Sequence, residues 1–377
     1  MRFSACLAIV GAEAILMAVA QPARADSDRV LCIGASANFD GQVAACTRLI
    51  ELGQRPGNNL AVVYFDRGNG YRGKGDLDHA IADYSQAITI DPKYAHAYNN
   101  RGNAYAATGD HDRAMADFNQ AIALNPQDAH AYDNRGNGYA VNGDLDHAIA
   151  DYDRVIALDP RNAHAYNNRG NAFTIKGDLD HAVADFDQAI VLEPKDASAH
   201  NNRGNAYSKK GDFDRAVADF SEAISLDPKL ATAYSNRGLA YANKGVYDSA
   251  IADFDQAIAI NPSFAHAYSD RGGVYNAKGD FDRAIADASR AIALDPKFAW
   301  AYNNRAVAYF AKGDFDHAIA DFSDAIALDP KFASPLYGRG VAKIKKGDIG
   351  AGDADIAAAK TIQADIANSM VKIGVSP

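Results

Sequence analysis

Basic residues, long apolar runs and cysteines are all scarce in this sequence. Lysine and arginine total 38 against 48 acidic residues, which gives a net charge of −10. This balance disfavours nucleic acid as a partner, because binding to phosphates requires clustered basic side chains. Beyond residue 25, no segment approaches the ~20 apolar residues that a membrane-spanning helix needs. We therefore expect a folded protein without nucleic acid as a partner and without membrane insertion.

The first 25 residues differ in composition from the rest of the chain. Arg2 precedes the apolar segments 5–12 and 14–20, which are interrupted by Glu13, and Ala23-Arg24-Ala25 follows them. A positive start, an apolar core and a small-x-small site are typical of a secretory signal peptide. The sequence thus predicts cleavage after residue 25 and a periplasmic or secreted protein. If this segment is not a signal peptide, the protein is cytoplasmic.

The most regular feature of the chain is a proline that returns every 34 residues. A fixed period in the range of ~20–50 residues indicates a solenoid or another repeat array. The prolines in this register are Pro92, Pro126, Pro160, Pro194, Pro228, Pro262, Pro296 and Pro330.

Residues 95–128 illustrate how one period is built. Tyr98, Gly102 and Tyr105 recur at helical spacing, and Ala114 and Phe118 do so again in the second half. Gly109-Asp110 between them suits the end of one helix and the N-cap of the next. Asn125-Pro126 ends the second helix. Gly102 and Ala114 are small, so we expect the two helices to approach closely there.

The period, the large–small–large pattern and the closing proline resemble the tetratricopeptide repeat family. In that family the first aromatic is usually tryptophan, where this chain has Tyr98, and a leucine precedes the glycine, where it has Arg101. The resemblance covers residues 61–364. It implies an all-α fold, a right-handed α-solenoid of stacked antiparallel helix pairs whose first helices line the concave side.

The repeat pattern divides the chain into four parts. Residues 1–25 form the predicted signal peptide, and residues 26–60 a degenerate N-terminal capping hairpin. Residues 61–332 form eight repeats. Residues 333–377 form a degenerate ninth repeat, whose second helix, roughly 351–371, is expected to be a solvent-facing cap. Terminal copies in such arrays are commonly atypical.

One stripe of each first helix, opposite its tyrosines, is predicted to form the concave wall. It is rich in asparagine in the first half of the chain, and asparagine offers both a donor and an acceptor to an extended peptide backbone. The alternative is a solvated surface inherited by duplication. The predicted amide contacts are Asn69, Asn99, Asn103, Asn137, Asn167, Asn171, Asn205 and Asn303.

The last third of the wall is more apolar. Trp300, Phe310, Tyr337 and Ile344 gather there, and tryptophan and tyrosine often dominate binding surfaces. This cluster is either a binding patch with Trp300 as its anchor, or the place where the C-terminal cap packs.

Two further features predict cross-links. After signal cleavage only Cys32 and Cys46 remain, and export favours a disulfide between them. Arginine recurs from Arg67 to Arg339 and aspartate from Asp83 to Asp355 in all nine repeats. We expect a ladder of bidentate pairs that replaces the leucine contact of the family. The alternative is surface charge preserved by recent copying.

Several tempting motifs are set aside. Residues 68–73 spell G-x-G-x-x-G but fall inside a helix, and the nucleotide-binding motif needs a strand before it. The histidine column beginning with His96 would be spaced ~10 Å from repeat to repeat, too far for shared metal ligation. No nucleophile stands beside a candidate base. We predict no catalytic residues, no metal site and no cofactor.

The function predicted from these patterns is binding rather than catalysis. The leading hypothesis is a protein- or peptide-binding scaffold that uses the concave face of the solenoid, with protein or peptide as the partner. The alternatives are a self-assembling structural solenoid and a regulatory subunit of an envelope enzyme. Because repeat folds host many functions, the family implies binding and little more.

Overall fold

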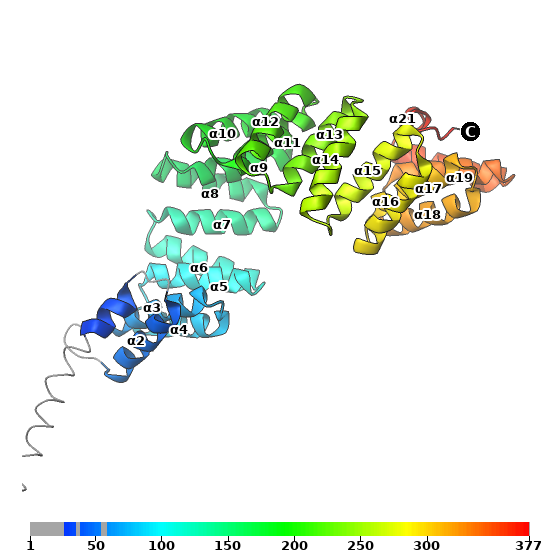
Figure 1. Ribbon diagram of the computed structural model, residues 1–377. Helices are drawn as coiled ribbons and strands as arrows, with labels where there is room; N and C mark the ends of the chain where they lie inside the picture. Colours follow the sequence, from blue (N-terminus) through cyan, green and yellow to red (C-terminus); the bar gives the residue numbers. More distant parts are fainter. Residues whose placement is uncertain (1–25, 35–37, 54–58, 377) are drawn as a thin grey trace, which may run out of the picture. The chain divides into compact units, whose positions relative to one another are not determined.

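The computed structural model describes residues 26–34, 38–53 and 59–376, and every regular element in these ranges is a helix (Figure 1). The predicted signal peptide, residues 1–25, lies outside the described residues. None of the described helices is long and apolar enough to cross a membrane. The chain divides into an N-terminal unit, residues 1–177, and a C-terminal unit, residues 178–377.

The N-terminal unit begins with a helix over residues 26–33, and successive helices then pack side by side as antiparallel pairs. Its remaining helices are α2 (Phe39–Glu51), α3 (Leu60–Gly73), α4 (Leu77–Ile90), α5 (Ala95–Ala107), α6 (His111–Leu124), α7 (Ala129–Val141), α8 (Leu145–Leu158) and α9 (Ala163–Lys176).

The C-terminal unit repeats the same arrangement and ends in one short helix. Its helices are α10 (Leu179–Leu192), α11 (Ala197–Lys209), α12 (Phe213–Leu226), α13 (Ala231–Asn243), α14 (Tyr247–Ile260), α15 (Ala265–Lys278), α16 (Phe281–Leu294), α17 (Ala299–Ala311), α18 (Phe315–Leu328), α19 (Ala333–Lys345), α20 (Ile349–Ile362) and α21 (Ile366–Lys372).

The turn inside each repeat follows from local chemistry. After α5, Gly109 takes a φ of 83°, which is strained for any residue with a Cβ. Asp110 then caps α6 by accepting a hydrogen bond from the backbone N–H of Arg113. At the other end of α6, Asn125 is extended because it precedes Pro126. The predicted helix, turn, helix order is confirmed.

The predicted close approach of the two helices is also confirmed. A Cβ atom built on Gly102 would lie 2.7 Å from the ring of Phe118 and 3.2 Å from the carbonyl oxygen of Ala114. Real Cβ atoms do not come so near, so α5 and α6 can pack at this distance only through glycine. Phe118 is 2% exposed and fills the space around the contact.

Arginine–aspartate pairs flank this contact, and for the eight pairs that the structure describes within a unit the predicted ladder is confirmed. Each guanidinium donates two hydrogen bonds of 2.6–2.8 Å to its carboxylate, so these residues are not merely copied surface charge. The pairs are Arg67–Asp83, Arg101–Asp117, Arg135–Asp151, Arg203–Asp219, Arg237–Asp253, Arg271–Asp287, Arg305–Asp321 and Arg339–Asp355.

The arginine of each pair also donates a third hydrogen bond, to a side chain on the helix that precedes its own. Arg237, for example, also donates to the Ser221 hydroxyl of the preceding second helix, at 3.0 Å. The hydrogen bonds from Arg237 to Asp253 hold the pKa of this arginine above its usual value. One side chain thus fixes three helices against one another. Arg169 and Asp185 belong to different units, and their pairing stays a prediction.

Side-chain amides form a second link between repeats. Asn134 donates to Asn99, Asn236 to Asn201, and Asn304 to Ser269, at 2.9 to 3.1 Å. In each case the donor lies on the first helix of one repeat and the acceptor on the first helix of the repeat before. The repeat at residues 265–298 departs from this rule, because Asp270 stands where its neighbours have asparagine. Burial raises the pKa of Asp270 to about 6.

The N-terminal end is closed by a cross-linked hairpin. A disulfide joins Cys32 in the helix over residues 26–33 to Cys46 in α2, with their Cα atoms 5.0 Å apart. Both cysteines are fully buried. The side-chain amide of Gln42 donates to the backbone oxygens of Cys32 and Asp66, which ties the hairpin to α3.

The C-terminal end is closed differently, and one expectation there is wrong. The predicted single helix over residues 351–371 is two helices, because α20 stops at Ile362 after the 14 residues common to second helices. The seven-residue α21 then packs against α19 and buries Ile366 and Met370. In α18, Ile319 and Ile326 pack against the core, but α20 carries the exposed Asp353 and Lys360 at those positions. A further repeat would have to bury these two charges.

The arginine–aspartate pair in the middle of the C-terminal unit gives a first prediction. Asp253→Ala leaves the half-buried Arg237 without its carboxylate and should lower the free energy of unfolding by about 3 kcal/mol. Replacing both partners, with Arg237→Leu and Asp253→Ala, should cost less than half of that, because no unpaired charge remains. Urea unfolding followed by circular dichroism measures both. A single variant that loses less than about 1 kcal/mol would contradict the role of the pair.

The disulfide gives a second prediction. Cys46→Ala reopens a loop with a sequence separation of 14, which should destabilise the hairpin by about 3 kcal/mol in the chain-entropy model. Stability in repeat arrays is local, so faster hydrogen exchange should be confined to the helices nearest the hairpin. Mass-spectrometric exchange on the oxidised, reduced and variant proteins tests this. Free thiols at Cys32 and Cys46 in the oxidised protein would refute it.

Asp270 gives a third prediction. Its pKa is about 6 in the folded protein and about 4 when unfolded. The folded state therefore binds more protons between these values, and the free energy of unfolding falls as pH rises from about 4 to about 6. Asp270→Asn restores the residue of neighbouring repeats and should stabilise the protein by about 1 kcal/mol at pH 7.5, with little effect at pH 4. Equal shifts in melting temperature at the two pH values would argue against this titration.

Candidate functional site

The predicted amide wall is partly accessible in the N-terminal unit. Asn103 is half-buried, and Asn137 is exposed. The side-chain oxygen of Asn69 accepts hydrogen bonds from Tyr84 and Asn100, at 2.9 and 2.8 Å. The oxygen of Asn137 likewise accepts hydrogen bonds from Tyr152 and Asn168, at 2.7 and 3.3 Å. Asn69 and Asn137 are therefore both engaged with structural partners, although Asn137 is exposed, and Asn103 is the amide best placed to meet a ligand.

Two of the predicted amide contacts are wrong. Asn99 is 6% exposed and Asn303 is 4% exposed, so neither can line an open wall. The reason is that this position turns toward the next repeat, where Asn99 accepts the hydrogen bond from Asn134. The half-buried Asn167, Asn171 and Asn205 are not buried in this way, and a binding role for them stays a prediction.

The apolar cluster predicted in the last third of the wall contains both buried and exposed side chains. Phe310 and Tyr337 are buried in the core cluster that also contains Ile366 and Met370 of α21, so a binding role for these two is wrong. Ile344 is half-buried and lies against Gly352 of α20. These side chains serve the packing of the C-terminal cap, which was the alternative interpretation.

Trp300 behaves differently from the rest of that cluster. It is 56% exposed, and its ring lies 4.3 Å from that of Phe332, centroid to centroid. His266 and Phe298 form an equivalent ring contact one repeat earlier, also at 4.3 Å. Trp300 is therefore an accessible aromatic surface supported by a second ring rather than a side chain packed under the cap.

A groove in the N-terminal unit is formed by α5, α6 and α7. We call it the Met115–Gly138 groove. Its volume is about 300 Å³, and most of its lining is apolar with amides at the edges. The lining residues are Asn103, Ala106, His111, Ala114, Met115, Phe118, Asn134, Asn137, Gly138 and Val141.

The groove arises from two matched exceptions to the repeat. Neighbouring second helices carry Ile81 and Ile149 where α6 has Met115, and neighbouring first helices carry Ala104 and Ala172 where α7 has Gly138. A Cβ on Gly138 would lie 2.7 Å from the sulfur of Met115. The flexible methionine thus lies over the glycine, where the two neighbouring repeats have an isoleucine and an alanine at these positions.

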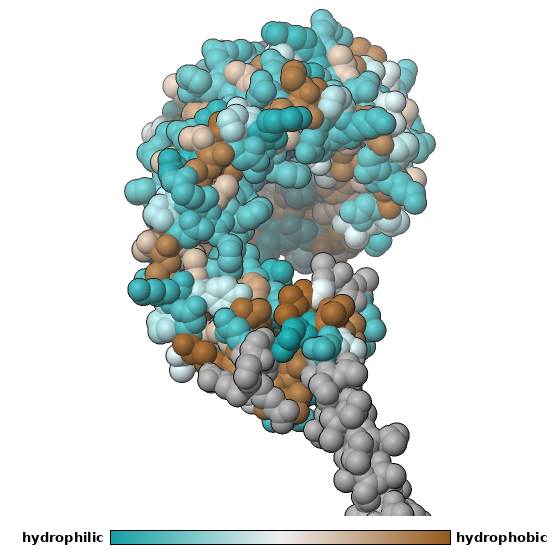
Figure 2. All heavy atoms as spheres, turned by 90° about the vertical axis from the view of Figure 1, so that its left-hand side faces the viewer, coloured by the Kyte–Doolittle hydropathy of each residue, from teal (hydrophilic) through white to brown (hydrophobic). Residues whose placement is uncertain are grey.

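A large apolar side chain borders this groove on the solvent side. Val141 at the end of α7 lines the groove and is 72% exposed. Ile175, at the equivalent place on α9 in the next repeat, is 66% exposed. Elsewhere the surface is more mixed, and in Figure 2 hydrophobic residues form scattered spots between hydrophilic ones on the visible face. Exposed side chains of this size beside a concavity are typical of an interaction site.

Sequence reasoning predicted Asn103 and Asn137 at this place but missed the apolar floor. It did not single out Met115, Gly138 or Val141. The signal was present in the repeat columns. Met115 and Gly138 differ together from the neighbouring repeats, and His111, which also lines the groove, stands where those repeats have Leu77 and Leu145. Because Met115 and Gly138 touch and differ together from their neighbours, we interpret their contact as specific to this place in the array.

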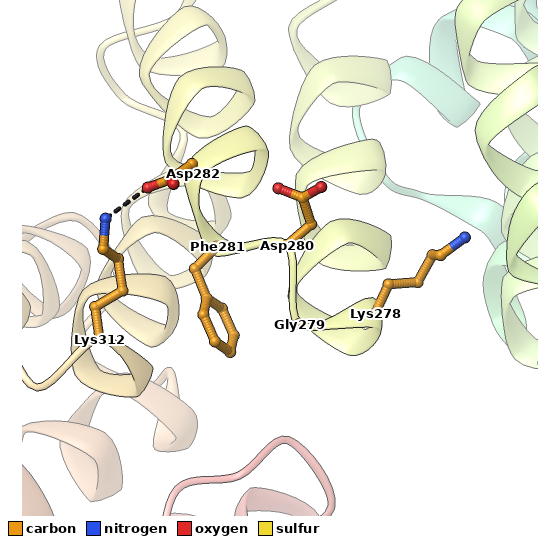
Figure 3. A pocket seen from close by; sticks show the side chains of 6 residues that line it. All are labelled: Lys278, Gly279, Asp280, Phe281, Asp282 and Lys312. Carbon is orange, nitrogen blue, oxygen red and sulfur yellow. Dashed lines mark hydrogen bonds and ion pairs between the residues drawn. The ribbon is translucent and has the colours of Figure 1, made fainter.

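A second kind of hollow recurs at the turns of the C-terminal unit. One copy is lined by Lys278, Gly279, Asp280, Phe281, Asp282 and Lys312, and another lies at the corresponding residues 210–214 and 244. Figure 3 shows Lys312 reaching to Asp282, to which it is hydrogen-bonded at 2.5 Å, while Lys278 points away from both. Lys278 in turn pairs with Asp248. These lysines and aspartates already neutralise one another in ion pairs that join adjacent repeats. We therefore do not assign a binding site to the hollows.

No metal site is found in the described part of the chain. No group of three or more histidine, cysteine, aspartate or glutamate side chains there is arranged to hold a metal ion. Most buried carboxylates belong to the arginine ladder. What the Met115–Gly138 groove offers is an apolar surface and neutral amide hydrogen bonds.

Comparison with solved structures supports the fold. A tetratricopeptide repeat protein from Parabacteroides merdae is 20% identical and has a TM-score of 0.55, with 65% of this chain and 97% of that one covered. PilW, a type IV pilus biogenesis factor, is 21% identical and has a TM-score of 0.51, with 54% and 95% covered. At these identities the likeness concerns the fold alone. No curated protein sequence matches the chain.

Family models match along most of the described repeats. A model for the TPR repeat matches residues 68–109, 136–174, 170–211, 204–245 and 272–313, and one for the tetratricopeptide repeat matches residues 95–128, 231–264 and 299–332. Repeats of this kind make a protein-interaction scaffold. The chain belongs to the tetratricopeptide repeat family.

Proposed function

We propose that this protein is a non-catalytic scaffold that binds an extended segment of a partner protein, and that the Met115–Gly138 groove holds an apolar side chain of that segment. The observation that carries the proposal is the groove itself. It is open, about 300 Å³ in volume, and apolar at its floor. A cavity of this size matches the small end of ligand pockets, which suits one leucine, methionine or phenylalanine side chain.

The edges of the groove suit a peptide backbone. Asn103, Asn134 and Asn137 line it. Asn134 already donates to Asn99, and the oxygen of Asn137 accepts from Tyr152 and Asn168. Asn103 is thus the amide that can both donate to a carbonyl and accept from an N–H of a ligand. An extended segment needs both kinds of partner because its own backbone groups are unpaired. The combination of an apolar anchor and amide edges therefore favours an extended polypeptide over a small polar ligand.

Trp300 is the corresponding candidate in the C-terminal unit. Its exposure and its support by Phe332 suit a rigid anchor. The alternative function, a self-assembling solenoid, is less well supported, because the exposed Asp353 and Lys360 of α20 oppose the stacking of a further helix pair. A regulatory subunit would use the same binding surface.

Export remains part of the proposal. The disulfide between Cys32 and Cys46 supports an oxidising compartment, since such bonds seldom persist in the cytosol. The periplasm or the cell exterior satisfies this condition. N-terminal sequencing of the protein from its source tests cleavage after residue 25.

The groove gives a fourth prediction. The paired substitution Met115→Ile with Gly138→Ala installs the residues of neighbouring repeats and should fill the groove while preserving stability. Random dodecapeptides displayed on phage are selected on the wild-type chain, and enriched peptides are synthesised for anisotropy titrations. We expect these peptides to carry an apolar anchor and to bind the paired variant at least about tenfold more weakly.

Val217→Ile in α12 is the matched control, since it makes the same kind of exchange in the same repeat column outside the groove. Its affinity for the selected peptides should equal that of the wild type. Undiminished affinity of the paired variant would remove the groove from the binding site. Trp300→Ala, measured with the same peptides, tests the second candidate anchor independently.

A further inference from the structure

We propose that the Met115–Gly138 groove is selective for a basic segment, in which a lysine or arginine two to four residues from the apolar anchor pairs with Asp133. This inference rests on the proposed function, since it specifies what kind of segment the groove takes. It assigns Asp133 as the specificity-determining residue of the wall in the N-terminal unit.

Asp133 is an exception within its own repeat column. It is the only carboxylate at this position of the first helix, where the other repeats have an amide, hydroxyl or aromatic side chain. The equivalents in the other eight repeats are Phe65, Asn99, Asn167, Asn201, Ser235, Ser269, Asn303 and Tyr337.

The hydrogen bonds that Asp133 receives are weak. Asn137 and Asn168 each donate an amide hydrogen to one of its oxygens, and both distances are 3.4 Å. By comparison, the carboxylates of the arginine ladder receive two charged bonds at 2.6–2.8 Å, as Asp151 does from Arg135. Asp133 is half-buried, and this burial raises its pKa. The carboxylate is thus partly desolvated without a cation to compensate.

The neighbouring cations are engaged elsewhere. On α7, Arg135 is bonded to Asp151 and to Asn119. On α9, Arg169 is bonded to Asp153, and Lys176 to Asp146. The histidines near Asp133 are the exposed His130 and His164. Within the described residues no ion pair reaches Asp133, so its charge is available to a ligand.

Asp133 and the groove share one face of α7. Asp133, Asn137 and Val141 follow at intervals of four residues, which places them in one row along the helix. Asn137 and Val141 line the groove, and Asn137 contacts Asp133. Eight residues of helix span about 12 Å, and an extended chain covers this distance in about four residues. A cation two to four residues from the anchor therefore reaches the carboxylate from the groove.

A second carboxylate adds negative charge at the start of the same helix. Asp128, which caps α7, is 7% exposed, and its Oδ2 has no hydrogen-bond partner among the described residues. The exposed His96 ring approaches that oxygen with its Nδ1 at 3.6 Å. A positively charged segment is complementary to such a surface, and an acidic segment would be repelled.

The test uses three acetylated, fluorescein-labelled nonapeptides in a glycine–serine background. Each carries one leucine and, four residues later, lysine, norleucine or glutamate. Norleucine keeps the aliphatic stem of lysine without its charge. Affinities of the full chain are measured by anisotropy at pH 7.5 in low salt. We expect the lysine peptide to bind about fivefold or more tightly than the norleucine peptide, and the glutamate peptide to bind most weakly.

Asp133→Asn is the decisive variant, because asparagine is the residue of neighbouring repeats and the fold should be retained. It should abolish the preference for lysine while leaving the affinity for the norleucine peptide unchanged. Asp78→Asn removes one exposed negative charge from α4, outside the groove, and should preserve the preference. Added salt should reduce the preference in the wild type.

The outcomes separate the two proposals. Equal binding of lysine and norleucine peptides overturns the basic specificity but leaves the groove as a peptide site. A lysine preference that persists in Asp133→Asn overturns the assignment of this residue. If no peptide binds the wild type and the phage selection yields none either, the proposed function of the groove fails as well.

Discussion

The half-buried arginine–aspartate pair is the interaction on which each repeat depends. It joins the first and second helices of a repeat through two bonds and reaches the preceding second helix through a third, as Arg237 does with Asp253 and Ser221. A leucine at this place, the residue that the wider family uses, would supply apolar contact but no direction. The ion pair fixes the rotation of the first helix as well as its distance, because both charges are costly to bury unless the geometry is met.

Because the ion pair fixes the rotation of each first helix about its axis, the other residues of that helix can differ between repeats without changing how the helices pack. The position of Asn99 is turned into the boundary between repeats, and the position of Asn103 and Asn137 is left at the surface. Neighbouring repeats tolerate asparagine, serine or aspartate at the boundary because the amide links there are secondary. Asp270 and Asp133 are such substitutions, each with a pKa raised by burial. The ladder offsets the cost of keeping these acids in place.

The fold was largely predictable from sequence because every rule that defines it is local and repeated. The proline period, the Gly109-Asp110 turn and the Gly102–Phe118 contact each follow from neighbouring residues. The site was less predictable. Helical periodicity alone placed Asn99 and Phe310 on the wall. The method fails there because exposed and buried stripes of a helix are separated by less than the ~100° of rotation that one residue contributes. The packing of α21 against α19, which buries Tyr337, depends on a helix that matches no repeat.

Comparison between copies inside one chain supplies what periodicity cannot. Where all copies agree, as at Arg101 and Asp117, the residue serves packing shared by every repeat. Where one copy departs alone, the change is tolerated. Where two touching residues of adjacent repeats depart together, as Met115 and Gly138 do, the contact between those repeats has changed its shape. Asp133 lies one helical row from that change. Met115 belongs to one repeat, and Gly138 and Asp133 belong to the next, so the three departures meet at a single junction between repeats. The ligand that we propose uses the groove and the carboxylate at that junction together.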